Sequence, residues 1–205
     1  MEAFTTLDGA AIVLDLANVD TDQIIPSRFM RTPRAQGYGS FLFHDLRVDA
    51  HGTLNPDFPV NAESARGAQI LICGENFGCG SSREAAVYAL ADFGIRCMVG
   101  PSFGDIFRNN AFKNGLLTVV LEKDALASLR TACEGGSVPV RVDLAAQVIS
   151  CGKFATRFAI ESFWKECLLA AADDIDLTLR EQGGIDEFFE RRMKTCPWVA
   201  QPRRL

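Results

Sequence analysis

The sequence of 205 residues has little of what marks several common classes of protein. No apolar run approaches the ~18 residues of a membrane-spanning helix, so the sequence predicts no transmembrane segment. The formal net charge is −5, because acidic residues outnumber basic ones, and this argues against a nucleic-acid-binding protein. An acidic chain can still hold a local basic pocket, so an anionic substrate remains compatible with the composition.

Metal-ligating residues are also scarce and widely spaced. The chain has two histidines, His44 and His51, and no two cysteines form a C-x-x-C pair. Zinc and iron–sulfur sites need several such ligands at close spacing, so we expect no metal site on this chain.

The seven cysteines are odd in number, which indicates reduced thiols rather than a disulfide framework. They are Cys73, Cys79, Cys97, Cys133, Cys151, Cys167 and Cys196. The first 16 residues, MEAFTTLDGAAIVLDL, lack the basic and long apolar segments of a signal peptide. We therefore expect a cytoplasmic protein.

Hydrophobic residues make up 48% of the chain and charged residues 23%, which is typical of a globular protein that buries a sizeable core. We predict one domain over residues 1–196 and a mobile tail over 197–205. The expected strands are 11–16, 68–73, 96–100 and 116–121, and the expected helices are 83–93, 103–113 and 124–133. Because these strands and helices alternate, the sequence predicts an α/β fold with a mixed, mostly parallel sheet flanked by helices.

The pattern changes in the last third of the chain. Short alternating segments predict an antiparallel meander at 138–144, 147–151 and 154–160, followed by helices at 162–172, 175–181 and 185–194. Earlier in the chain, residues 27–66 show no clear period, and a long loop of this kind in a compact domain is often functional. Pro26 is expected to stop any helix that residues 18–25 could begin.

The strongest functional signal is the glycine-rich stretch from Gly74 to Glu84, between a predicted strand and a predicted helix. Its glycines permit positive φ, so backbone N–H groups can point into a concavity. We expect Ser81 and Ser82 in the first turn of the helix, where the partial positive charge favours an anion. Arg83 adds a planar group suited to a carboxylate.

The residues alone leave the purpose of this stretch open. It is neither a P-loop nor a dinucleotide fingerprint, and no histidine follows Ser81 to act as the base of a serine hydrolase. It is equally compatible with a structural connection that has a capping serine and a surface arginine. Cys79 fits an inert thiol better than a reactive one.

Three segments make the sequence recognisable: 18–26 (NVDTDQIIP), 76–84 (NFGCGSSRE) and 105–110 (DIFRNN). They resemble the small subunit of 3-isopropylmalate dehydratase, which is the swivelling domain of the aconitase superfamily. The resemblance extends from residues 4–7 to residues 173–179 and so covers almost the whole chain.

The resemblance implies a swivelling β/β/α domain and a heteromeric hydro-lyase of leucine biosynthesis. In this family a separate large subunit carries a four-iron–four-sulfur cluster, and the small subunit closes over it. The reaction moves a hydroxyl group between adjacent carbons of isopropylmalate by dehydration and rehydration. No cofactor is then expected on this chain, and the implied partners are the large subunit and a dicarboxylic acid, with neither nucleic acid nor membrane.

The resemblance also implies roles for individual residues. Ser81 matches the catalytic serine, whose alkoxide removes the proton beside a carboxylate. Gly80, Ser82 and Arg83 match positions that bind the substrate, and Asp22 matches a catalytic acidic residue that orients a group on the partner. Without the resemblance, Asp22 would fit a turn or a helix cap.

The segment 27–39 matches the loop that senses the substrate's variable group. Phe29 and Met30 would contact an alkyl group, or Arg31 would meet a third carboxylate; alternatively, Phe29 and Met30 belong to the core and Arg31 to the surface. Relatives commonly have histidine after Arg-Glu, where this chain has Ala85. This departure leaves open a related acid of the citraconate, dimethylmalate or homoaconitate type.

Two interpretations of other classes are compatible with the sequence. One is a non-catalytic module that uses the glycine-rich stretch only to hold a carboxylate or a partner. The other is an independent enzyme with its own cofactor, which would show a cluster spectrum when the purified chain is supplied with iron and sulfide.

Overall fold

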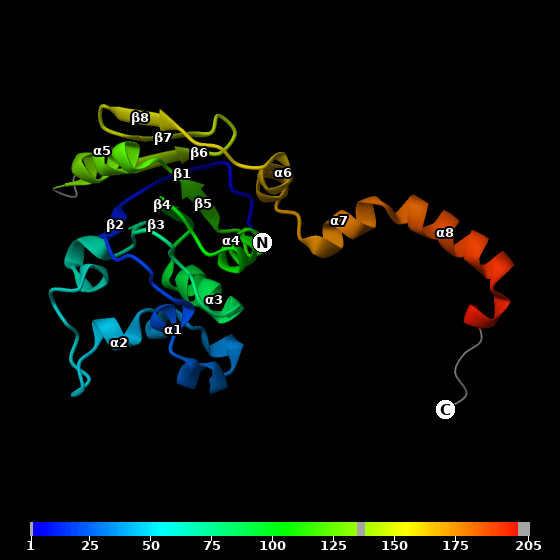
Figure 1. The fold of residues 1–205 in the computed structure, drawn as a ribbon, viewed down its shortest axis with the longest axis horizontal. Coiled ribbons are helices and arrows are strands. Elements are labelled where there is room, and N and C mark those ends of the chain that lie inside the picture. Colours follow the sequence, from blue (N-terminus) through cyan, green and yellow to red (C-terminus); the bar gives the residue numbers. More distant parts are fainter. Residues whose placement is uncertain (1, 135–137, 201–205) are drawn as a thin grey trace. The chain divides into compact units, whose positions relative to one another are not determined.

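The computed structural model describes residues 2–134 and 138–200 (Figure 1). The chain divides into two compact units, residues 1–171 and 172–205. A single domain over residues 1–196 stays a prediction. Of the predicted tail, residues 197–200 form a short 3-10 helix and residues 201–205 lie outside the described residues. No helix among the described residues is both long and apolar enough to cross a membrane.

The first unit is built on a four-stranded parallel sheet with the strand order β2-β3-β4-β5. The strands are β2 (Ala11–Leu14), β3 (Ile70–Cys73), β4 (Cys97–Gly100) and β5 (Leu117–Val120). Nearly every residue of β3 to β5 is buried, as expected of parallel strands that are covered on both faces. The predicted alternation of strands and helices is confirmed.

A second four-stranded sheet is wholly antiparallel, with the order β1-β6-β7-β8. Its strands are β1 (Thr6–Gly9), β6 (Val140–Asp143), β7 (Val148–Cys151) and β8 (Phe154–Arg157). The predicted meander is therefore confirmed. The sequence did not predict β1, which pairs antiparallel with β6.

The two faces of the parallel sheet belong to two different hydrophobic clusters. Leu71 and Met98 face a cluster shared with helix α3 (Glu84–Phe93) and residues 19–65. Ile72 and Val99 face the other cluster, which includes Val142 and Ile149 of the antiparallel sheet. The first unit is thus layered as antiparallel sheet, parallel sheet and helices, which confirms the expected β/β/α arrangement (Figure 1).

The predicted helices of this unit are also present. They are α3 (Glu84–Phe93), α4 (Asp105–Lys113), α5 (Lys123–Cys133) and α6 (Ser162–Ala170). The weakly patterned region contains one further helical turn, α2 (His44–Arg47), and several 3-10 turns.

One expectation near the start of the chain is wrong. A single helical turn, α1 (Thr21–Ile24), forms immediately before Pro26. Asp20 caps it by accepting from the N–H groups of Asp22 and Gln23, and the Gln23 side chain accepts from the Asp20 N–H. This reciprocal capping box satisfies the first free donors of the turn and offsets the stop signal of the proline.

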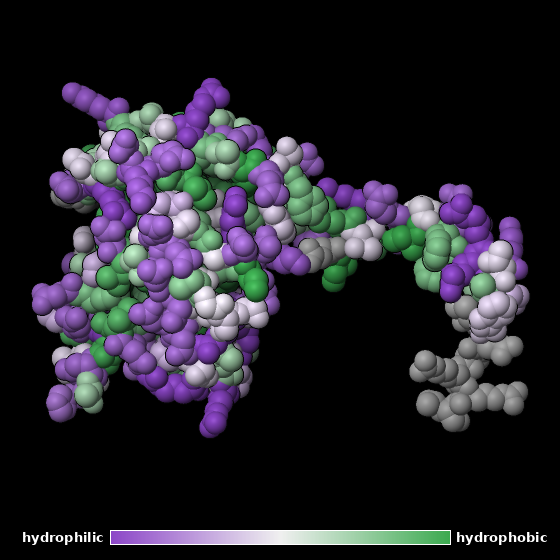
Figure 2. All heavy atoms as spheres, in the orientation of Figure 1, coloured by the Kyte–Doolittle hydropathy of each residue, from purple (hydrophilic) through white to green (hydrophobic). Residues whose placement is uncertain are grey.

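The second unit contains α7 (Asp174–Arg180) and α8 (Gln182–Thr195), in agreement with the prediction of two helices there. Figure 2 shows hydrophobic atoms exposed along these helices. The exposed apolar side chains of this unit include Ile175, Leu179, Phe188, Phe189, Met193 and Trp198.

Gly78, which follows β3, and Gly67, which precedes it, have similar φ angles, so comparing them tests how tightly the chain is packed around Gly78. Gly78 has φ of 74°, and an added Cβ would overlap the Phe107 ring. Gly67 has φ of 70°, but, apart from the glycine itself and its two chain neighbours, no atom lies within 4 Å of the position of a Cβ there. We expect Gly67→Ala to lower the free energy of unfolding by about 1–2 kcal/mol, the cost of a left-handed alanine.

Gly78→Ala should cost about 1–3 kcal/mol more than Gly67→Ala, because the new methyl group also overpacks the core. Urea unfolding of the isolated chain, followed by circular dichroism, measures both changes. Equal losses for the two variants would contradict the close contact between Gly78 and Phe107.

Candidate active site

The glycine-rich stretch lies directly beside residues 18–22. Gly78 N donates to Val19 O at 2.7 Å, and Thr21 N donates to Cys79 O at 3.0 Å. The two segments follow β2 and β3, which are adjacent parallel strands, so their carboxyl ends meet at one edge of the sheet. Binding sites of α/β proteins commonly lie at this edge.

Along the stretch, residues with positive φ alternate with residues of ordinary φ, as expected for a glycine-rich binding loop. Asn76, Gly78 and Gly80 have φ of 57°, 74° and 89°, with ordinary residues between them. Phe77 anchors the stretch, since its side chain is fully buried and its ring lies 5.6 Å from that of Phe107. A buried anchor thus supports an exposed end at residues 80–82.

The sequence predicted Ser81 and Ser82 in the first turn of a helix, and this prediction is wrong. Arg83 is extended, with φ of −77° and ψ of 103°, so α3 begins only at Glu84. The field of a helix terminus falls off within about one turn, which weakens its effect on the two serines. The side chain that contacts Ser81 comes instead from α1, and the Arg83 N–H donates to the Ser81 carbonyl oxygen at 2.8 Å.

Thr21 is the residue of α1 that contacts Ser81. Its hydroxyl oxygen lies 3.1 Å from Ser81 Oγ and 3.1 Å from the Ser81 carbonyl oxygen. The side chain of Thr21 is buried, whereas Ser81 is exposed. Thr21 is not among the residues predicted for the site; the capping pattern of Asp20 and Gln23 was the signal that could have placed it on a helical turn.

Asp22 and Arg83 form an ion pair on the other side of this turn. Asp22 Oδ1 also accepts from Ser27 N at 3.0 Å. The hydrogen bond from Arg83, followed by that from Ser27, lowers the pKa of the Asp22 carboxyl. The structure therefore brings together three of the predicted site residues, Asp22, Ser81 and Arg83.

A shallow pocket of about 260 Å³ opens beside Ser81 and is lined by residues 78–81 and 104–107. We call it the Ser81 pocket. One wall is the start of α4, whose N-cap Gly104 has no side chain to satisfy the first backbone N–H groups. Such groups attract anions, so the pocket suits a carboxylate.

Residues 27–39, which were predicted to sense the substrate's variable group, begin next to Asp22, because Ser27 N donates to the Asp22 carboxylate. Within this segment, Phe29 is half-buried and its ring stacks on Phe41 at 4.3 Å. Met30 is 44% exposed and Arg31 is exposed. The alternative that Met30 belongs to the core is therefore wrong, while Phe29 is held in place by packing.

The cysteines of this chain do not fit an iron–sulfur cluster. Among residues 2–134 and 138–200, no three side chains of histidine, cysteine, aspartate or glutamate are grouped so that they could hold a metal ion. Burial raises the pKa of Cys73 and of Cys97, and it raises that of Cys133 to about 12. Thiols in such surroundings are poor sources of the thiolate that a cluster needs.

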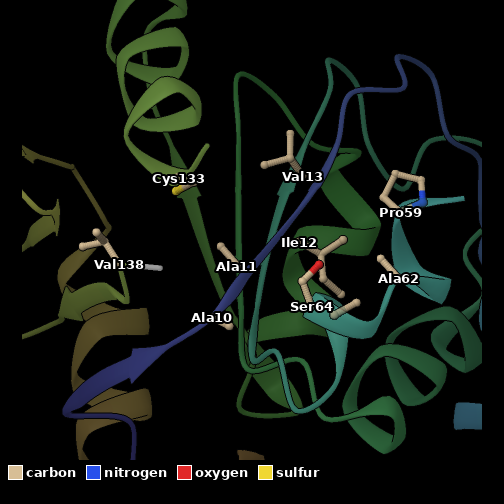
Figure 3. Close-up of a pocket in the computed structure, with 10 residues that line it drawn as sticks. Ala10, Ala11, Ile12, Val13, Pro59, Ala62, Ser64, Cys133 and Val138 are labelled. Carbon is tan, nitrogen blue, oxygen red and sulfur yellow. The ribbon is translucent and has the colours of Figure 1, made fainter. Parts of the chain in front are cut away.

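A second hollow, of about 370 Å³, lies along the outer edge of β2 (Figure 3). Ala10 to Val13 form its floor, with Pro59 and Ala62 on one side and Cys133 on the other. Its lining is mainly small and apolar, and it includes none of the residues predicted for the site.

Comparison with known proteins gives one consistent result. The family model of the aconitase C-terminal domain matches residues 1–124. The small subunit of 3-isopropylmalate dehydratase from Dinoroseobacter shibae is 48% identical over 201 residues, which cover 97% of this chain and all of that protein. This chain belongs to the family of 3-isopropylmalate dehydratase small subunits.

Two further relatives extend the comparison. A 3-isopropylmalate dehydratase from Rhizopus niveus is 47% identical over 97% of this chain, which corresponds to 27% of that longer protein. The crystal structure of a 3-isopropylmalate dehydratase from Methanocaldococcus jannaschii has a TM-score of 0.65 and 26% identity, covering 89% of this chain and 99% of that one. The name small subunit implies a larger partner.

The ion pair of the site predicts a titration that can be measured. We expect carbon NMR of the side-chain carboxyls to show Asp22 titrating below its usual 3.8, and Arg83→Gln to move its pKa up towards that value. Because the folded-state pKa is lowered, the pair stabilises the fold above about pH 3.8, and this stabilisation is lost as the pH falls through the lowered pKa.

Arg28→Gln is the matched control. Arg28 pairs with Asp45, and its hydrogen bond is the largest cause that lowers the pKa of Asp45 to about 2, so this variant should raise that pKa. The pKa of Asp22 should stay low, because the hydrogen bonds from Arg83 and Ser27 remain. An Asp22 that titrates at 3.8 in the unmodified chain would contradict the ion pair.

Proposed function

We propose that this chain is the small subunit of a 3-isopropylmalate dehydratase, a hydro-lyase that interconverts 2-isopropylmalate and 3-isopropylmalate in leucine biosynthesis. The observation that supports this most directly is the geometry around Ser81. An exposed hydroxyl lies at the mouth of a pocket of about 260 Å³, 3.1 Å from a buried hydroxyl and two residues before an arginine in the sequence.

Ser81 acts as the base in this proposal. Its alkoxide takes a proton from the carbon beside a substrate carboxylate, and the electron pair left on that carbon expels hydroxide from its neighbour. A serine hydroxyl is a weak base at neutral pH, so the site must stabilise its charged form. Gly80, Ser82 and Arg83 bind the substrate carboxylate, and Asp22 holds the Arg83 guanidinium in place.

The proposed partner is a large subunit, and a four-iron–four-sulfur cluster held there would supply Lewis-acid polarisation of the departing hydroxyl. The described residues of this chain do not fit such a cluster, and in this proposal the chain performs the proton transfer and carboxylate binding. We place the pair in the cytoplasm, because all seven cysteines are free and none of them is fully exposed.

A second candidate is a related dehydratase whose acid has a third carboxylate. The observation that favours it is the exposure of Arg31 beside Met30. An arginine there can bind a further carboxylate, whereas a methionine contacts an alkyl group.

The first test concerns Ser81 in the co-purified pair of subunits. We expect Ser81→Ala to lower kcat about 10²–10⁴-fold, the usual effect of losing a proton-transfer group, and to change KM little. Ser128→Ala is the control, since Ser128 lies on the exposed side of α5 and bonds only its own helix. If Ser81→Ala kept near-normal turnover, this chain would be a non-catalytic binding module.

The second test concerns the substrate. Met30→Ala should raise KM for 2-isopropylmalate about 4–15-fold, which corresponds to one or two methylene contacts at ~0.8 kcal/mol each. Arg31→Ala should leave that KM unchanged. The reverse pattern, together with turnover of a tricarboxylic acid, would favour the second candidate.

A further inference from the structure

Thr21 is one of two buried threonines in the described part of the chain. Its exposed fraction is 2%, and that of Thr118 on β5 is 1%. The two threonines differ in their partners. Thr118 Oγ1 has no hydrogen-bond partner in the structure, whereas Thr21 Oγ1 lies 3.1 Å from two oxygens of Ser81. Burial of a hydroxyl is costly unless it is bonded, so the contact of Thr21 is specific.

The number of protons in this contact determines which oxygen donates to which. The Thr21 hydroxyl has one proton, and the Ser81 carbonyl oxygen can only accept. When Ser81 is neutral, Thr21 donates to the carbonyl oxygen and the Ser81 hydroxyl donates to Thr21 Oγ1. When Ser81 has lost its proton, the Thr21 hydroxyl can rotate and donate to Ser81 Oγ instead. Both states use the same oxygen positions.

The backbone holds Thr21 rigidly for this purpose. Its N–H donates to Cys79 O at 3.0 Å, within the glycine-rich stretch, and its carbonyl accepts from Ile25 N at 3.1 Å. A threonine on a helical turn uses mainly two χ1 rotamers, and the two contacts with Ser81 favour the one seen here. The hydroxyl is therefore fixed in place before any substrate binds, which spares the reaction a reorganisation step.

We propose that Thr21 is a positioning residue for Ser81. The Thr21 hydroxyl keeps its proton but redirects its hydrogen bond from the Ser81 carbonyl oxygen to Ser81 Oγ, and so stabilises the alkoxide. This inference rests on the proposed function, in which Ser81 is the base. The Ser81 proton goes to water when the alkoxide forms. After Ser81 takes the substrate proton, the Thr21 proton returns to the carbonyl oxygen, so Thr21 itself loses and gains nothing.

The test compares variants of Thr21 in the pair of subunits. Thr21→Val keeps the shape and removes the hydroxyl, and we expect kcat to fall about 10–100-fold, as for the loss of a hydrogen bond to a charged group. KM should change little, and the rising limb of the pH profile should move to higher pH, because the charged base has lost a donor. Thr21→Ser keeps the hydroxyl and should remain within about threefold of the unmodified enzyme.

A purely structural role predicts the opposite order. Thr21→Val would then be harmless and Thr21→Ser, which loses the methyl group, the poorer enzyme. Thr118→Val is the matched control for burial and should change neither kcat nor the pH profile. Thermal unfolding of each isolated chain reports folding; if the valine variant does not fold, Thr21→Ala against Thr21→Ser gives the same comparison, since both lack the methyl group.

Ser81→Ala separates the positioning role of Thr21 from the role of Ser81 as the base. In a Ser81→Ala background, Thr21→Val should cause no further loss, since there is no alkoxide to stabilise. If Ser81→Ala is inactive while Thr21→Val has the kcat and pH profile of the unmodified enzyme, the positioning role is wrong and the function stands. If Ser81→Ala remains active, the proposed function itself fails.

Discussion

The site depends on one set of contacts, the backbone hydrogen bonds that join residues 18–22 to residues 75–79. They follow from the parallel pairing of β2 with β3, which brings the two following segments to the same edge of the sheet. Because these bonds use backbone groups, they fix Ser81 relative to Thr21 without depending on surface side chains. The ion pair of Asp22 with Arg83 then adds a second link across the same junction.

The two sides of this junction have different physical character. Toward the core, Phe77 is fully buried and Gly78 leaves no room for a side chain against Phe107. Toward solvent, residues 80–82 are exposed. A rigid support with an exposed reactive end is what a site shared between two subunits requires, because the reacting group must be precise in position and still accessible to a surface that arrives later.

The sequence predicted those parts of the structure that depend on local pattern. The buried runs of β3 to β5 and the helices between them were recognisable because period and punctuation are properties of neighbouring residues. Strand β1 was missed because its stability comes from pairing with Val140 to Asp143, far along the chain. The contact of Thr21 with Ser81 spans 60 residues, so no local pattern contains it. The position of the serines relative to α3 depended on the extended backbone of Arg83, which the residue type does not dictate.

The charges around Ser81 bear on why the site needs a second subunit. Arg83 is already paired with Asp22, so it adds little net positive charge, and Asp105 at the wall of the Ser81 pocket adds a negative one. A dicarboxylate that approached this surface alone would meet backbone donors at the start of α4 but no excess of cations. The open pocket would also leave the Ser81 alkoxide in water, where a charged base gains little from its neighbours. On the proposed function, closure against the large subunit would therefore exclude the water that otherwise weakens every interaction with Ser81, and positive charge for the second carboxylate would have to come from outside this surface.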